Sequence, residues 1–143
     1  MRKVLVPCIV MLLSFPTMAK SVTYSCEQKY SVNINTSGHT GSVKVYKDGK
    51  PVAITSSDKF FIDLETHAYD MNGDTVFNYS AYKGFDHTKE SVAVSDFYTL
   101  ITKNSTLDSP AKIAKLSVFL SGDTKSELYN CSIGLDLSGI DLN

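Results

Sequence analysis

Apolar and polar residues alternate along most of this chain, and glycine, asparagine and aspartate interrupt the alternation at short intervals. Side chains of a β-strand point to opposite faces in turn, so a period of two indicates strands with one buried face. The first two stretches each place apolar side chains on one face: Val22, Tyr24 and Cys26, then Tyr30, Val32 and Ile34. The pattern therefore favours an antiparallel β-protein.

Turn residues divide the chain into about eight or nine short strands. Asp48-Gly49, Asn72-Gly73 and Gly122-Asp123 each lie between two such stretches, and these residue types tolerate positive φ. We expect Phe60, Ile62 and Leu64 to form the buried face of one strand, and residues 128–137 to form the last strand. Residues 109–112 fit either the start of one helical turn or the approach to a strand from Ile113.

This spacing of strands predicts an all-β fold, a single antiparallel meander that forms a small barrel or a sandwich. The pattern does not separate these two architectures. No internal repeat and no low-complexity linker divides the chain. We therefore expect one β domain over residues 20–143.

The first 19 residues have the three parts of a signal peptide. Arg2 and Lys3 supply the positive start, residues 4–15 are almost wholly apolar, and Thr17-Met18-Ala19 offers small residues at a cleavage site. The apolar run is shorter than the roughly 20 residues that span a bilayer, and no later stretch is longer. The sequence predicts cleavage after Ala19, a periplasmic or secreted product, and no membrane span.

Two cysteines remain once Cys8 has left with the signal peptide. Cys26 and Cys131 lie near opposite ends of the mature chain, and an even pair in an oxidising compartment predicts a disulfide. Such a bridge would join the first strand to the last.

The charged residues argue against nucleic acid as a partner. Without Arg2 and Lys3 the chain has 12 basic and 15 acidic residues, a net charge of −3, and no arginine at all. Arginine is the usual residue for phosphate and base-edge contacts, and the lysines here are scattered among acids.

Residues that could carry catalysis or bind a metal are not arranged for either. His39, His67 and His87 have no spacing typical of a zinc site, and they fall in or beside predicted turns. No Gly-x-Ser-x-Gly elbow is present, and residues 70–74 fit a hairpin turn better than a calcium loop. We predict a protein that is not an enzyme and needs no cofactor and no metal.

Aromatic residues are the one unusual feature of the composition. Tyr82 and Phe85 stand around Lys83 and Gly84, with His87 close by. Tyrosine at a loop offers a large contact area at low entropic cost, which is typical of recognition surfaces. Tyr82 could instead cap the edge of the core. We predict a partner-binding loop made of Tyr82, Lys83, Gly84, Phe85 and His87.

The two ends of the chain and this loop resemble one family, the periplasmic inhibitors of C-type lysozyme. The similar segments are Tyr24-Ser25-Cys26, Leu128-Tyr129-Asn130-Cys131 and Tyr82-Lys83-Gly84. The resemblance implies a small barrel with a disulfide between its first and last strands, and Lys83 entering the lysozyme cleft. The chain lacks the tryptophan of the family's loop, and its stretch between the cysteines is longer.

The function that the sequence predicts is therefore binding of another macromolecule, with lysozyme inhibition as its most specific form. Two alternatives stay open: a structural subunit of a surface fibre, and a carrier that holds a small ligand in a barrel mouth.

Overall fold

The computed structural model describes residues 18–83 and 96–134. Residues 1–17, which hold most of the predicted signal peptide, and residues 84–95 and 135–143 lie outside the described ranges. The described residues form nine strands and one short helix: β1 (Ala19–Cys26), β2 (Tyr30–Ser37), β3 (Thr40–Lys47), β4 (Lys50–Ser57), α1 (Phe60–Asp63), β5 (Glu65–Tyr69), β6 (Thr75–Lys83), β7 (Asp96–Lys103), β8 (Ile113–Phe119) and β9 (Glu127–Ile133).

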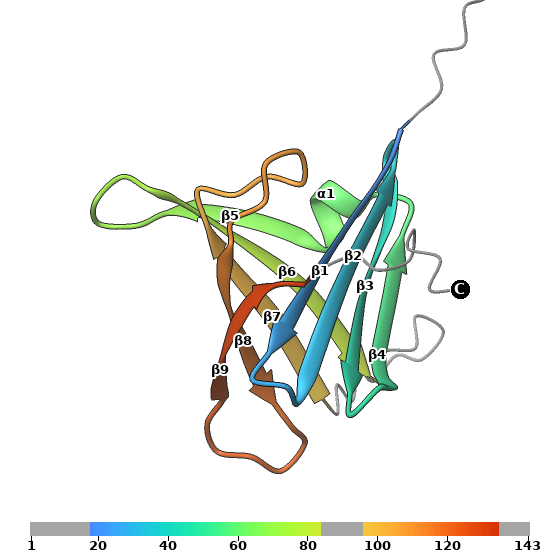
Figure 1. Cartoon of the computed structure of the whole chain (residues 1–143), viewed down its shortest axis with the longest axis vertical. Coiled ribbons are helices and arrows are strands. Elements are labelled where there is room, and N and C mark those ends of the chain that lie inside the picture. Colours follow the sequence, from blue (N-terminus) through green and yellow to red (C-terminus); the bar gives the residue numbers. More distant parts are fainter. Residues whose placement is uncertain (1–17, 84–95, 135–143) are drawn as a thin grey trace, which may run out of the picture.

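All nine strands belong to one antiparallel sheet, which confirms the predicted all-β meander with one disulfide. The strand order is β4-β3-β2-β1-β9-β8-β7-β6-β5, so every pair of adjacent strands is consecutive in sequence except β1 and β9, and β4 and β5 stand at opposite ends of the order. The sheet curls until β4 comes against β6, which gives the barrel-like shape in Figure 1. The architecture is therefore a curled single sheet, and not two stacked sheets.

The disulfide joins the first and last strands, as predicted. Cys26 and Cys131 lie directly opposite each other in the β1–β9 ladder, with the two sulfur atoms 1.98 Å apart. This bridge closes a sequence separation of 105 residues. In the chain-entropy model a loop of that length stabilises the fold by up to about 4.7 kcal/mol.

Side chains from the concave faces of the strands, and from α1 and the residue that follows it, fill the interior. The largest of these are less than 2% exposed: Tyr24, Phe60, Ile34, Leu64, Leu100 and Leu116. At one end, the Tyr30 ring packs against the rings of Tyr129 and Tyr98, with centroid separations of 5.0 and 6.2 Å. The interior is a packed core because the alternation places one large apolar side chain per two residues inside.

The turns that were expected from local sequence are present. Asp48 and Gly49 have φ of 51° and 77°, Gly73 has 82° and Gly122 has 92°. These backbone conformations favour glycine, asparagine and aspartate, which explains why the sequence signals were informative at these positions.

The strand expected at residues 60–64 is wrong, because this segment is helical. Phe60 and Leu64 are 0% and 1% exposed, whereas Ile62 is 75% exposed. Residues four apart share a face of a helix, and the amide of Leu64 donates to the carbonyl of Phe60 at 2.9 Å. Phe60, Ile62 and Leu64 fit the strand period of two, and Phe60 and Leu64 alone fit one face of a helix. The contacts of Phe60 with the core favour the helix.

Two further boundaries differ from expectation. Residues 109–112 form no helical turn, and β8 begins at Ile113, so the second of the two alternatives holds. The last strand ends at Ile133 within the described residues, and the rest of its predicted length lies outside them.

The hydroxyl group of Thr55 joins β4 to β6 where the curled sheet meets itself. The amide of Tyr82 donates to Oγ1 of Thr55 at 3.0 Å, and the same hydroxyl donates to the carbonyl of Tyr82 at 3.4 Å. The ladder between β5 and β6 stops at the pair of Glu65 and Tyr79. Thr55 thus satisfies backbone groups of β6 beyond the end of that ladder. We call this contact the β4–β6 closure.

Candidate protein-binding surface

Three aromatic side chains lie side by side on the outer face of β6, β7 and β8. In the ladder registers Tyr82 is opposite Phe97, and Phe97 is opposite Phe119. The rings of Tyr82 and Phe97 are parallel within 2°, with centroids 6.0 Å apart. Directly opposite residues on one sheet face contact each other, so these side chains form a continuous row.

Leu128 extends this row onto β9. It pairs with Ser117, two residues before Phe119, and is therefore a diagonal neighbour of the Phe119 ring. Leu128 is 61% exposed, and Phe97 and Phe119 are each 38% exposed. We call these four residues, Tyr82, Phe97, Phe119 and Leu128, the outer apolar row.

Phe97, Phe119 and Leu128 point away from the core because their neighbours in sequence point inward, whereas Tyr82 is partly buried and packs against the core. Tyr98, Val118 and Tyr129 are at most 8% exposed and belong to the core. Adjacent apolar residues in one strand cannot both face inward, since strand side chains alternate. The apolar pairs Phe97-Tyr98, Val118-Phe119 and Leu128-Tyr129 were the signal for this surface in the sequence. The prediction missed Phe97, Phe119 and Leu128 because their proximity depends on register.

The backbone that carries Tyr82 is held on both sides. Thr55 bonds to its amide and carbonyl, and β7 pairs with it along the other edge. Partial burial raises the pKa of the Tyr82 phenol above its usual value, with a smaller contribution from the carboxylate of Asp63. The ring of Tyr82 is therefore neutral at any physiological pH and behaves as an apolar surface with a hydrogen-bonding tip.

The structure places only part of the predicted binding loop. Tyr82 and Lys83 end β6, and Lys83 is exposed and lies opposite Asp96 in the ladder. Asp96 accepts a hydrogen bond from the amide of Ser121 at 3.0 Å, which ties this end of β7 to the turn after β8. The other predicted loop residues, Gly84, Phe85 and His87, lie outside the described residues.

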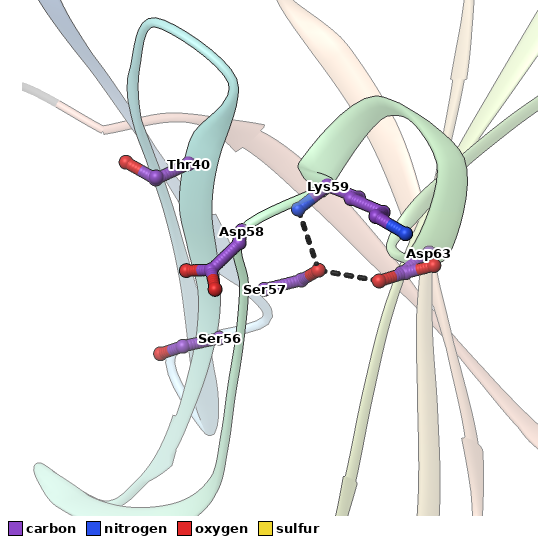
Figure 2. A pocket seen from close by; sticks show the side chains of 6 residues that line it. All are labelled: Thr40, Ser56, Ser57, Asp58, Lys59 and Asp63. Atoms are coloured by element: carbon purple, nitrogen blue, oxygen red, sulfur yellow. Dashed lines mark hydrogen bonds between the residues drawn. The ribbon is translucent and has the colours of Figure 1, made fainter.

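A polar pocket of about 480 Å³ lies at the end of β4, beside α1. Its lining residues are shown in Figure 2: Thr40, Ser56, Ser57, Asp58, Lys59 and Asp63. The Ser57 hydroxyl accepts from the amide of Lys59 at 2.9 Å and donates to the carboxylate of Asp63. These bonds stabilise the turn that leads into α1, which is a common local use of serine.

The Ser57 hydroxyl donates its hydrogen bond to Asp63, and its partners within residues 18–83 and 96–134 include no imidazole. A nucleophilic serine needs a base that is itself held in place by a third group. An apolar hollow of about 370 Å³ adjoins this pocket, and His39 lines it together with Phe61 and Ile62.

Residues that could bind a metal do not converge in the part of the chain that the structure describes. No group of three histidine, cysteine, aspartate or glutamate side chains comes together in residues 18–83 and 96–134. His67 lies in strand β5, where its ring is 5.7 Å from that of Phe77. His39 follows β2 in a turn, and His87 lies outside the described ranges.

Comparison of the chain with family models, curated proteins and solved structures finds no match. Within the described residues, no helix has the length and apolarity needed to cross a bilayer. The outer apolar row, four neighbouring side chains on four consecutive strands, is thus the surface feature that most specifically suggests a partner.

Proposed function

We propose that this chain is an exported β-domain that binds another protein through the outer apolar row. The most specific form of this proposed function is inhibition of a C-type lysozyme. The observation that carries the proposal is the row of Tyr82, Phe97, Phe119 and Leu128 on a face where alternation would otherwise place polar residues. Contiguous exposed apolar side chains mark interaction sites more often than isolated ones do.

The chemistry of the row suits a protein partner. Aromatic side chains dominate binding hot spots because they bury a large area with few rotatable bonds. Lys83 follows Tyr82 at the end of β6, where the alternation of strand side chains directs it to the opposite face of the sheet from the row. Removal of residues 1–19 would leave a net charge of −3, so long-range attraction favours a partner of net positive charge.

The two alternatives have less support. A fibre subunit that donates its N-terminal strand needs an arm outside its own sheet, but β1 pairs with β2 from Ala19 to Cys26. A ligand carrier needs a cavity inside the barrel, and here large side chains such as Tyr24, Leu100 and Leu116 fill the interior.

The test is a lysozyme inhibition assay with the mature protein and three variants. We expect Phe119→Ser and Lys83→Ala each to weaken inhibition by about 30-fold or more, the loss of roughly 2 kcal/mol typical of a hot spot. Ile54→Ser is the matched control, because Ile54 is a 54% exposed apolar residue on the outer face of β4, outside the row. It should leave inhibition unchanged.

Two outcomes would count against the proposal at different levels. Absence of inhibition across several C-type lysozymes removes the lysozyme form. The broader form falls if immobilised wild-type and Phe119→Ser proteins retain the same set of extracytoplasmic proteins in equal amounts.

A further inference from the structure

The strand β5 (Glu65–Tyr69) ends the sheet and has a neighbour on one side only. It pairs with β6 over its whole length, and no described strand lies beyond it. Thr66, His67, Ala68 and Tyr69 are all exposed, Tyr69 at 75%. Figure 1 shows the β5–β6 hairpin projecting from the body of the barrel, so another chain can approach this edge.

The hydrogen bonds at both ends of β5 establish which of its backbone groups face outward. The amide of Ser80 donates to the carbonyl of Leu64 at 3.0 Å, and the amide of Asp70 donates to the carbonyl of Asp74 at 2.9 Å. In an antiparallel ladder, residues that bond to the partner strand alternate with residues whose N–H and C=O point away. Leu64 and Asp70 bond to the β6 side, so Glu65, His67 and Tyr69 direct their backbone groups to the open edge.

These three outward residues are self-complementary about His67. In an antiparallel pairing of β5 with a second β5, a twofold axis at His67 places this residue opposite its own copy. The same axis places Glu65 opposite Tyr69 of the other chain, and Tyr69 opposite Glu65. Each facing pair then exchanges two backbone hydrogen bonds, and no outward group of the strand is left over.

Apart from one charged residue, Glu65, the open edge also lacks the devices that normally prevent such pairing. Residues 65–69 contain no lysine and no proline, and the β5–β6 register is continuous. By contrast, β4 carries Lys50 and Pro51, and its register with β3 shifts between Val45 and Tyr46. Charged residues, prolines and bulges are the usual protection of edge strands.

The hairpin is held in place before any partner arrives. Nζ of Lys103 lies 3.0 Å from Asp70 Oδ2 and 2.6 Å from Asp74 Oδ2. Oδ1 of Asn104 accepts from the amide of Thr75 at 2.9 Å. These contacts anchor the hairpin tip to the end of β7, and a preordered edge loses less conformational entropy on pairing.

We propose that the open edge of β5 binds β5 of a second copy of this chain, so that the antiparallel sheet continues across a twofold axis at His67. This inference is independent of the partner proposed for the outer apolar row. A five-residue ladder buries less than the roughly 1,000 Å² expected of a stable interface. The dimer is therefore weak, and it is populated only at high protein concentration.

Residue 67 offers a test that depends on this register. Sedimentation velocity of the mature protein, up to about 1 mM, populates complexes with a Kd in the millimolar range. We expect wild type to move from monomer to dimer as concentration rises. His67→Lys and His67→Glu should each stay monomeric, because like charges meet at the axis, whereas an equimolar mixture of the two should form a heterodimer.

Ser132→Lys is the matched control, since it adds the same charge at an exposed position of β9 away from β5. It should dimerise as wild type does, and the amide spectra of all variants should show a folded barrel. The proposal fails if wild type stays monomeric throughout, or if His67→Lys dimerises as well as wild type. It also fails if the mixture of oppositely charged variants gives no heterodimer.

Discussion

β4 and β5 are both terminal strands of the nine-stranded sheet, but of these two only β4 contacts another described strand on its outer side. The curl of the sheet brings β4 against β6, and the Thr55 hydroxyl bonds to both backbone groups of Tyr82. β5 departs from the barrel with the β5–β6 hairpin, and no strand within residues 18–83 and 96–134 pairs with its outward backbone groups. The first half of β6 therefore pairs with β5, and its second half contacts β4.

This difference shows how a curled sheet can close without a complete ladder. A closed barrel removes its edges, whereas a sheet that closes over only part of a strand must leave one edge exposed. The side that closes here is tied by the core and by the closure, and we expect its residues to determine global stability. The open side should contribute to local order and to association.

The largest expected effect comes from Phe60, which lies between the two edges. Its ring is buried, stacks on Tyr79 of β6 at 6.3 Å, and would contact a Cβ placed on Gly41 of β3 at 2.6 Å. Phe60→Ala should therefore reduce the free energy of unfolding by about 3–5 kcal/mol, measured in denaturant. Phe61→Ala, on the half-exposed side of α1, should cost much less. Equal losses for the two variants would show that α1 does not join β3 to β6 as described.

A smaller effect is expected from the closure itself. Thr55→Val keeps the shape of the side chain but leaves the Tyr82 amide and carbonyl without their hydroxyl partner. We expect a loss of about 1–3 kcal/mol in the free energy of unfolding. Thr66→Val makes the same change on the exposed β5 strand and should stay within about 0.5 kcal/mol of wild type. If the two variants lose the same amount, the two edges do not differ in the way proposed.

The smallest effect is local and depends on pH. Hydrogen bonds to Lys103 lower the pKa values of Asp70 and Asp74 below their usual range. A lowered carboxyl pKa means that the contact stabilises the folded tip at neutral pH and is lost as pH falls through the lowered values. Intrinsic amide exchange slows as pH falls, so the quantity to compare is the protection factor of each amide. The protection factors of Asn72 and Gly73 should thus drop in acid, while those of core amides stay high.

Lys103→Gln provides the comparison for this pH effect. Its tip amides should already exchange fast at neutral pH, and the change with acid should be correspondingly smaller. Tip amides of wild type that keep their protection well below the lowered pKa values would indicate that backbone turn geometry alone orders the hairpin.

The interpretation from sequence was most successful where structure depends on neighbours along the chain. Asn72-Gly73 and Asp48-Gly49 form the expected turns because their backbone conformations are local properties. Phe60 and Leu64 misled it, because one helical turn and a short strand can both bury these two residues. The helix is the better arrangement because it places the Phe60 ring in the space beside Gly41 and Tyr79.

The residues of the candidate binding surface also fall into two groups, those that local sequence identified and those that only cross-strand pairing brings together. Tyr82 and Lys83 were identified from a local cluster of aromatic and basic residues, and both end β6. Phe97, Phe119 and Leu128 join Tyr82 through cross-strand pairing, which links positions far apart in sequence. A pairing register is set jointly by turns, bulges and the buried face of every strand, so a single stretch of sequence does not reveal it.

The sequence by itself determined that this chain is a β-meander in which most strands bury one face, with a disulfide between its ends. Those properties follow from a period of two, from turn residues and from the chemistry of two cysteines. Only the tertiary structure decided where the sheet meets itself and which strand keeps an open edge. The physical reason is that curl accumulates over the eight strands from β4 to β6, so the meeting of Thr55 with Tyr82 is a property of the sheet and not of a local segment.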